Sequence, residues 1–447
     1  MTLQPCYDFP NPNESILMSR TKVSVTAKGT VHEVDAEVRL ELLPDARIEV
    51  HGSLPKSLGL FDLDHLQKLT IAVKDIPGFC SRMNIRSDGD GVEFVWGPQN
   101  EPVIGLGDHR TKIDSIFFHL FNYKEIVRGT RVTAEKEDNS TFMIAHVDLK
   151  ASGWNVELKS LKTSPSTFKT LAETGGYGMT HVGCFRKEDG SSFDGKTAGE
   201  MLTVLRFFLS FSKGMWCNPC LAVGFDDKEK RGWEAWSSPQ GHWAKPSSWF
   251  DPNHCDQLVS LFPGFLAKCE NKDWQEALRE VIYWYLSSNC STLGRGIGID
   301  AGIILTQAAI ERLSFEYAVR YKRLIGAEGF KKLKAADKFR LLFSSLDIPI
   351  DIPASLPELQ KLAKAKEVNW IDAPQAITEV RNTLVHPVNK RRGQFDGVFF
   401  PVWNLSQWYL ELALLRICDY SGTYGNRLTQ RFVGQVETVP WDNTKVK

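Results

Sequence analysis

The hydrophobic period of this chain changes once, between residues 239 and 255, and this change constrains the fold more than any other feature. Before it, short Val-rich segments alternate apolar and polar residues, as in KVSVTAKGTVHEVDAEVRLEL at 22–42. Such alternation is typical of half-buried strands. After it, apolar residues recur at helical spacing. We expect helices at about 255–268, 273–289, 298–326, 335–346, 356–367, 372–386 and 402–420.

The connecting segment PQGHWAKPSSWFDPNHC, at 239–255, is rich in proline and tryptophan. The sequence therefore predicts an α+β multidomain protein. A β-rich domain, sandwich-like or barrel-like, spans 1–250, and an all-α bundle spans 255–435. One helix interrupts the β-rich part at 197–214, with Thr197 as the expected N-cap and Gly214 as the C-terminal stop.

Composition excludes several classes of protein. The chain has 54 basic and 54 acidic residues, so a generally cationic coat for nucleic acid is excluded, although a local basic face is not. The nine cysteines are scattered, which favours reduced thiols over a disulfide framework. We expect a cytoplasmic protein without membrane segments. No signal peptide is visible, and no stretch approaches the roughly 18 apolar residues that a membrane span needs.

One predicted helix carries polar residues in a pattern that packing does not explain. It lies within AITEVRNTLVHPVNK, at 376–390. At about 100° per residue, Ile377, Val380 and Leu384 form a narrow apolar seam. Asn382 and His386, at i and i+4, are neighbours on a face roughly opposite that seam. A histidine used for packing would instead lie on the seam.

The proline that follows predicts where this helix stops. Pro387 disfavours helical geometry in the preceding residue, so the helix should end or kink at His386. The partial negative charge of a helix C-terminus favours the protonated imidazole, and such a group can act as acid or base. Arg381 offers a forked cation suited to phosphate. The alternative is that all three polar residues are solvated surface groups.

Arg381-Asn382-Thr383-Leu384-Val385-His386 resembles the signature of HEPN-domain ribonucleases, in which a proline often follows the histidine. The context is similar as well. The motif lies late in a helical bundle, after a long helix with TQAAIERLSFEYAV at 306–319 and before a final Trp- and Leu-rich helix. This similarity covers about 255–430. More loosely, the β-rich half with LRFFLSFSKGMWCNPC resembles the module fused to HEPN in ApeA-like antiphage defence proteins.

The HEPN resemblance implies a metal-independent endoribonuclease without cofactors. The RNA 2′-hydroxyl attacks, leaving a 2′,3′-cyclic phosphate and a 5′-hydroxyl. His386 would be the acid or base, Arg381 would stabilise the charged phosphate, and Asn382 would hold the geometry. Such sites are usually shared across a dimer.

The resemblance also implies a biological setting. The protein would be a toxin-like effector of abortive infection that cleaves tRNA or another structured RNA. A phage-derived trigger would act at the β-rich domain. The competing hypothesis is a non-catalytic module that dimerises or binds nucleotide, with a β domain that binds a partner.

Positive charge near the motif is a candidate for RNA binding. Lys390, Arg391 and Arg392 follow the motif directly, and we expect them to contact phosphate. The stretch 321–340 is also basic and has two interpretations, a phosphate-binding surface or a solvated helical hairpin.

Cys217 and Cys220 have the spacing of half a zinc site or a redox pair. No second CxxC follows, so an incidental pair that enters a buried strand is the simpler interpretation, and metal binding stays open. Trp233, Trp236, Trp243 and Trp249 could stack on bases, although core packing is the simpler expectation.

Overall fold

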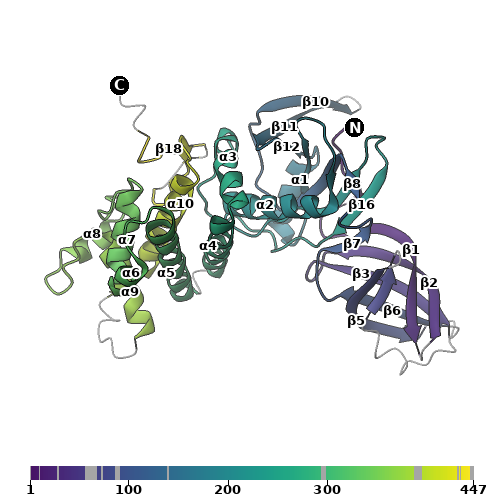
Figure 1. The fold of residues 1–447 in the computed structure, drawn as a ribbon, viewed down its shortest axis with the longest axis horizontal. Helices are drawn as coiled ribbons and strands as arrows, with labels where there is room; N and C mark the ends of the chain where they lie inside the picture. The colour runs from purple at the N-terminus through teal and green to yellow at the C-terminus, as the bar shows by residue number, and fades with distance from the viewer. Residues whose placement is uncertain are drawn as a thin grey trace.

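The computed structural model describes most of the chain and shows a β-rich half beside a helical half (Figure 1). The described residues are 2–9, 11–27, 30–55, 68–71, 74–85, 91–137, 140–292, 298–386, 395–429, 432 and 434–442. The α+β multidomain architecture expected from the change of period is therefore observed. None of the helices in these ranges is long and apolar enough to cross a membrane.

The first six strands close into a barrel. Its strand order is β1 (Ile16–Ala27), β2 (Thr30–Glu41), β3 (Arg47–Pro55), β6 (Gly91–Pro98), β5 (Lys74–Ile85) and β4 (Lys68–Ile71). Alternate residues fill the interior, because successive side chains of a strand point to opposite faces. Val23, Val38 and Val50 are accordingly buried.

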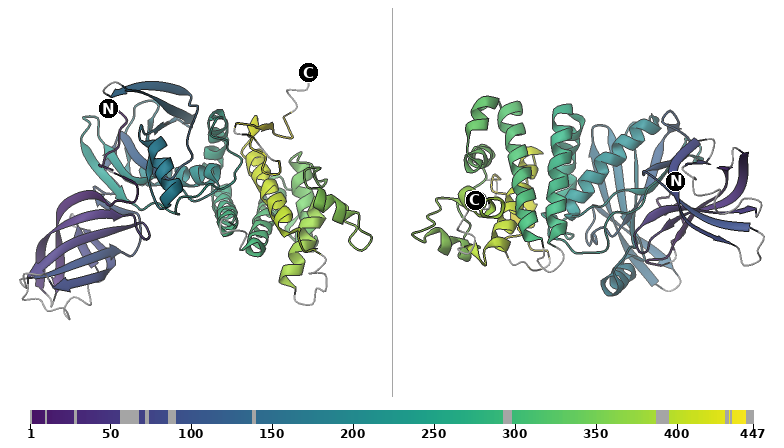
Figure 2. Two further views of the ribbon diagram at one scale, coloured as in Figure 1. Left: turned by 180° about the vertical axis from the view of Figure 1, so that it is seen from behind. Right: turned by 90° about the horizontal axis from the view of Figure 1, so that it is seen from below.

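An eight-stranded antiparallel sheet follows the barrel. Its order is β10 (Arg131–Glu137), β11 (Ser140–Ala151), β12 (Trp154–Ser160), β13 (Met179–Lys187), β9 (Ser115–Phe121), β15 (Cys220–Phe225), β16 (Arg231–Trp236) and β7 (Val103–Leu106). Two short strands, β8 (Lys112–Ile113) and β14 (Phe193–Asp194), pair beside it. The sheet lies between the barrel and the helices, as the view from below in Figure 2 shows.

Helices form most of the remaining chain that the structure describes. Two belong to the sheet region: α1 (Ser164–Thr174) and α2 (Gly195–Lys213). The helical half contains α3 (Asp256–Glu270), α4 (Lys272–Ser291), α5 (Ile299–Phe315), the π-helical η2 (Glu316–Tyr321), α6 (Ala327–Lys332), α7 (Ala335–Ser345), α8 (Pro357–Ala363), α9 (Ala373–Val385) and α10 (Phe399–Ile417). Two short strands, β17 (Thr423–Tyr424) and β18 (Glu437–Thr438), close the described chain.

One hydrophobic core joins the sheet to the helical half. The ring of Phe208 on α2 lies 5.2 Å from Phe262 and 5.4 Å from Phe265, both on α3, measured between ring centroids. All three side chains are almost fully buried. The change of hydrophobic period therefore marks a change of secondary structure and not a break in the core.

Two local expectations were wrong, and one helix was missed. Helix α2 begins two residues early, because the Asp194 carboxylate accepts a hydrogen bond from the Thr197 N–H at 2.8 Å and is the N-cap in place of Thr197. The long helix predicted at 298–326 turns π-helical at Glu316 and ends before Arg323, whose φ is 54°. Helix α1 was not predicted, because its Ser- and Thr-rich sequence lacks a clear apolar stripe. The stop at Gly214, with φ 81°, is confirmed.

Candidate functional site

The polar motif lies on α9, which packs against α5, α7 and α10. Ile377 and Val380 are fully buried, as the predicted seam requires, and Leu384 is half-buried against the same core. At its start, the Asp372 carboxylate accepts from the Gln375 N–H at 2.9 Å and caps the helix. The helix that presents the motif is thus held at its N-terminus and along one face.

The last helical residue of α9 is Val385, so the predicted end at His386 is confirmed. The backbone of His386 is extended, with φ −109° and ψ 108°, and its N–H still donates to the Asn382 carbonyl at 3.1 Å. The His386 side chain is exposed and Asn382 is half-buried. The imidazole is therefore accessible to a large substrate, and it is not a packed core histidine.

Arg381 is half-buried beside these two residues. Its Nη1 donates to the Asn382 Oδ1 over 3.4 Å, and its Nε is buried without a hydrogen-bond partner. Among the described residues, no carboxylate lies within ion-pair distance of this guanidinium. A buried donor without a partner is costly, so Arg381 retains hydrogen-bonding capacity for an anion.

The remaining members of the predicted site cannot be placed. Pro387, Lys390, Arg391 and Arg392 lie outside the described residues. Their expected contact with phosphate stays a prediction.

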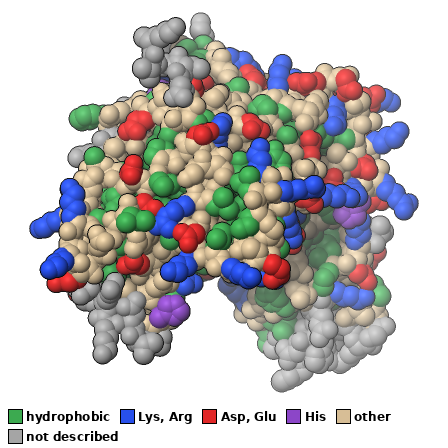
Figure 3. Space-filling view, turned by 60° about the vertical axis from the view of Figure 1, so that its left-hand side comes forward, with side chains coloured by type: hydrophobic (Ala, Val, Ile, Leu, Met, Phe, Trp, Pro, Cys, Tyr) green, Lys and Arg blue, Asp and Glu red, His purple; other side chains and the backbone are tan. Residues whose placement is uncertain are grey.

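Ion pairs occupy part of the basic stretch at 321–340. Lys338 pairs with Glu311, Arg340 with Asp372 and Asp337, and Lys331 with Glu328. On the face shown in Figure 3, Lys and Arg side chains are interspersed with Asp and Glu over the part that is coloured by type. The ion pairs favour the interpretation of this stretch as a solvated helical surface.

The cysteine pair is buried where strand β15 begins. Burial raises the pKa of the Cys217 thiol to about 11, and it also raises the pKa of Cys220. A metal ligand must be a thiolate, and neither thiol joins a metal-binding group among the described residues. The simpler interpretation, an incidental pair, is favoured. Trp233, Trp236 and Trp249 are buried, which confirms core packing for these three, whereas Trp243 is half-buried.

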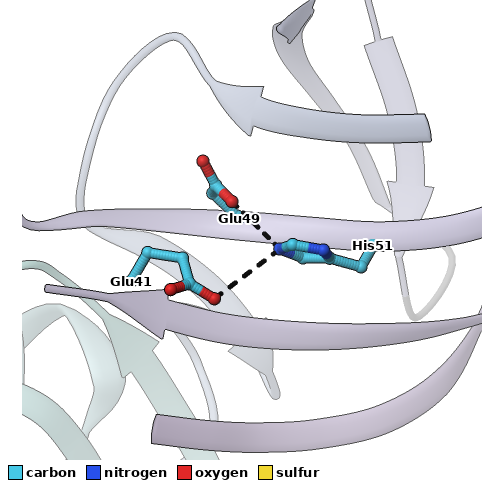
Figure 4. Close-up of side chains that lie close together, drawn as sticks. All are labelled: Glu41, Glu49 and His51. Atoms are coloured by element: carbon cyan, nitrogen blue, oxygen red, sulfur yellow. Dashed lines mark hydrogen bonds and ion pairs between the residues drawn. The ribbon is translucent and has the colours of Figure 1, made fainter. Parts of the chain in front are cut away.

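Within the described ranges, a single group could hold a metal ion: Glu41, Glu49 and His51 on β2 and β3 (Figure 4). The His51 Nε2 lies 2.9 Å from Glu49 Oε2 and 3.8 Å from Glu41 Oε1. The other Glu49 oxygen is 2.6 Å from the Arg47 Nε. The arginine already balances the buried Glu49 carboxylate, so this carboxylate has a partner within the protein.

A phosphate-loop pattern, GxxxxGKT, stands at Gly190–Thr197 and was missed from the sequence. The structure does not support phosphate binding there. Asp194 places a carboxylate on the first turn of α2, and Phe193–Asp194 pairs with β8. A carboxylate at that helix N-terminus occupies the position where a phosphate would bind.

Comparison with known proteins finds sequence similarity to proteins named YopA. Residues 108–246 match the family model of the YopA central domain, and residues 271–438 match that of the YopA C-terminal domain. The chain is 28% identical over 440 residues to the SPbeta prophage-derived uncharacterized protein YopA of Bacillus subtilis (strain 168), covering 96% of this chain and 95% of that protein. No solved structure matches the chain.

Proposed function

We propose that the helical half is a HEPN-type, metal-independent endoribonuclease and that Arg381, Asn382 and His386 form its catalytic group. One observation carries this proposal. The last turn of α9 and its cap present an exposed imidazole, His386, together with a guanidinium, Arg381, whose buried Nε has no partner. Cleavage of RNA needs one proton-transfer group and one fixed cation.

The chemistry assigns a task to each residue. The RNA 2′-hydroxyl attacks the adjacent phosphorus, the bond from phosphorus to the 5′-oxygen breaks, and a 2′,3′-cyclic phosphate and a 5′-hydroxyl result. His386 takes the proton of the 2′-hydroxyl or gives one to the leaving 5′-oxygen. Arg381 balances the charge on the phosphate, and Asn382, which accepts from Arg381, orients the guanidinium.

A single imidazole performs one of these proton transfers at a time. A second copy of the chain would supply the other, so the proposed active form is a homodimer through the helical half. The exposed position of His386 supports this arrangement, because the imidazole lies away from the seam of its own helix.

The proposed substrate is tRNA or another structured RNA in the cytoplasm, with Lys390, Arg391 and Arg392 as phosphate contacts. The proposed role is a toxin-like effector of abortive infection, triggered through the β-rich half by a phage product. The name of the B. subtilis relative states that it is prophage-derived, which supports a setting of conflict between phages.

Cleavage of tRNA by the purified full-length protein in the presence of EDTA tests the proposal. We expect the wild type to cut and to leave cyclic phosphate ends, His386→Ala to be inactive, and His242→Ala, a partly exposed histidine of the β-rich half, to cut as well as the wild type. The same variants are expressed in infected and uninfected bacteria to include any trigger. If the wild type cuts no RNA in any of these conditions, the proposal fails, and the non-catalytic interaction module takes its place. If His386→Ala cuts normally, the site assignment fails.

A further inference from the structure

A pocket of about 350 Å³ lies along helix α2, away from the motif on α9. Helix α2 contributes Gly195, Gly199 and Arg206 to its lining, strand β16 contributes Trp233, and helix α4 contributes Arg279. Sites for small molecules usually measure about 300–1,000 Å³. The pocket is large enough for a small metabolite.

Three polar atoms of this lining are buried and have no hydrogen-bond partner: Arg206 Nε, Asn218 Oδ1 and Trp233 Nε1. An unsatisfied buried group costs about 1–3 kcal/mol, so three in one pocket need an explanation. The other ends of two of these side chains are held in place. Arg206 Nη2 donates to Gln240 at 2.9 Å, and Asn218 Nδ2 donates to the Ser238 carbonyl at 2.9 Å.

Two glycines of α2 line the pocket. At Gly195 the chain is closely packed, because a Cβ there would lie 2.2 Å from the Asp108 carbonyl oxygen and 2.7 Å from Trp233 Nε1. A Cβ on Gly199 would meet nothing within 4 Å. Space and unsatisfied donors therefore occur together.

The Arg206 guanidinium has no ion-pair partner among the described residues of this pocket. The guanidinium stacks on Trp216 at 4.7 Å, and no described carboxylate forms an ion pair with it. The two acidic residues of the lining have partners within the lining: Glu101 accepts from the Ser238 N–H at 2.5 Å, and Glu200 lies 3.8 Å from Lys196. Burial lowers the pKa of Arg206, because the charged form is desolvated without compensation.

We propose that this pocket binds a small organic anion. A phosphate or carboxylate group of the ligand accepts hydrogen bonds from Arg206 and Trp233, and a hydroxyl or amino group donates to Asn218. Arg279 adds a second positive charge to the lining. The two donors and one acceptor left open in the lining match such a ligand.

Residues from both matched regions of the chain line the pocket. Arg206, Asn218 and Trp233 belong to the region that matches the YopA central domain, and Arg279 belongs to the region that matches the C-terminal domain. A bound anion would contact both regions. This inference stands independently of the nuclease proposal.

Calorimetric titration and thermal unfolding of the full-length protein test this inference, with AMP, glutamate, inorganic phosphate and adenosine as probes. We expect AMP or glutamate to bind saturably and to raise the Tm. Uncharged adenosine should do neither. The response to AMP against that to glutamate distinguishes a phosphate ligand from a carboxylate ligand. If no anionic probe binds at millimolar concentration, the inference is overturned.

Two variants locate the binding. Arg206→Gln removes the cation, and Gly199→Leu fills the pocket while it leaves every polar group in place. Each should weaken binding about tenfold or more. Arg128→Gln, an exposed arginine elsewhere in the β-rich half, should bind as the wild type does. If Arg206→Gln does not fold, Gly199→Leu alone decides, and unchanged affinity in that variant contradicts the inference.

Discussion

Glu411 on α10 and Arg427 near the C-terminus form an ion pair whose two side chains are fully buried, with Arg427 Nη2 2.7 Å from Glu411 Oε1. The Tyr285 hydroxyl on α4 donates to the same oxygen at 2.6 Å. This network ties the segment after β17 to two helices of the bundle. The Glu411 carboxylate and the Arg427 guanidinium balance each other, and Tyr285 adds a hydrogen bond to the carboxylate.

Removing one partner of this pair should destabilise the protein strongly. Arg427→Met leaves a buried carboxylate uncompensated, and we expect the free energy of unfolding to fall by about 3–5 kcal/mol. The double variant Glu411→Leu/Arg427→Met should recover much of that loss. Urea unfolding measures both. The control is Arg416→Met, which breaks an exposed pair with Asp347 and should cost at most about 1 kcal/mol. Equal losses in Arg427→Met and Arg416→Met would contradict the expectation.

The planar donor geometry of the Arg381 guanidinium, and not only its charge, should matter for RNA cleavage. Arg381→Lys keeps a cation but loses the planar donor set that matches phosphate, so we expect it to cut more slowly than the wild type and faster than Arg381→Ala. Cleavage rates on one tRNA substrate measure the order. As a control, Arg416→Lys changes an arginine that pairs with Asp347 and not with the cap of α9, and it should retain the wild-type rate once its fold is confirmed. An Arg381→Ala protein that cuts at the wild-type rate would remove Arg381 from the site.

His119 should make the stability of the protein sensitive to acid. This fully buried imidazole accepts from the Cys6 N–H at 2.9 Å and lies 3.1 Å from the Leu221 carbonyl, an arrangement that needs the neutral ring. Burial lowers its pKa from 6.5 to about 4. Below about pH 6.5, His119 is therefore protonated in the unfolded state but stays neutral in the folded state. The neutral His119 ring contributes fully to the free energy of unfolding above pH 6.5. This contribution falls by about 3 kcal/mol as the pH drops to about 4.

Unfolding by urea at several pH values checks this expectation. His119→Gln should be less stable than the wild type at neutral pH, since it disturbs a packed site. It should then lose less stability on acidification, so the two curves approach each other. Parallel curves would show that His119 does not titrate as its burial requires.

Two helical glycines should respond in opposite ways to alanine. A Cβ on Gly264 of α3 would lie 1.8 Å from the Cys418 carbonyl oxygen, so Gly264→Ala forces two segments apart and should cost about 1–3 kcal/mol. A Cβ on Gly199 of α2 meets no atom within 4 Å. Gly199→Ala should therefore stabilise the protein by up to about 1 kcal/mol through helix propensity. Thermal unfolding of the two variants measures whether each substitution stabilises or destabilises the protein. A loss of stability in Gly199→Ala would contradict the open space beside Gly199.

The sequence by itself determined the secondary structure of most of the chain, because side-chain period is a local property. The Val-rich alternation at 22–42 predicted β1 and β2, and the seam of Ile377 and Val380 predicted α9. Pro387 predicted the end of that helix at His386, since a proline restricts the residue before it. These features depend only on neighbours along the chain.

Only the tertiary structure decided which strands close into a barrel, which join the sheet, and which charges face one another. Arg206, Asn218 and Trp233 lie far apart in the sequence, and nothing in their local pattern distinguishes them from other polar or aromatic residues. The same holds for Glu411 and Arg427. Hydrogen bonding and desolvation depend on contacts across the fold, and no local pattern encodes these.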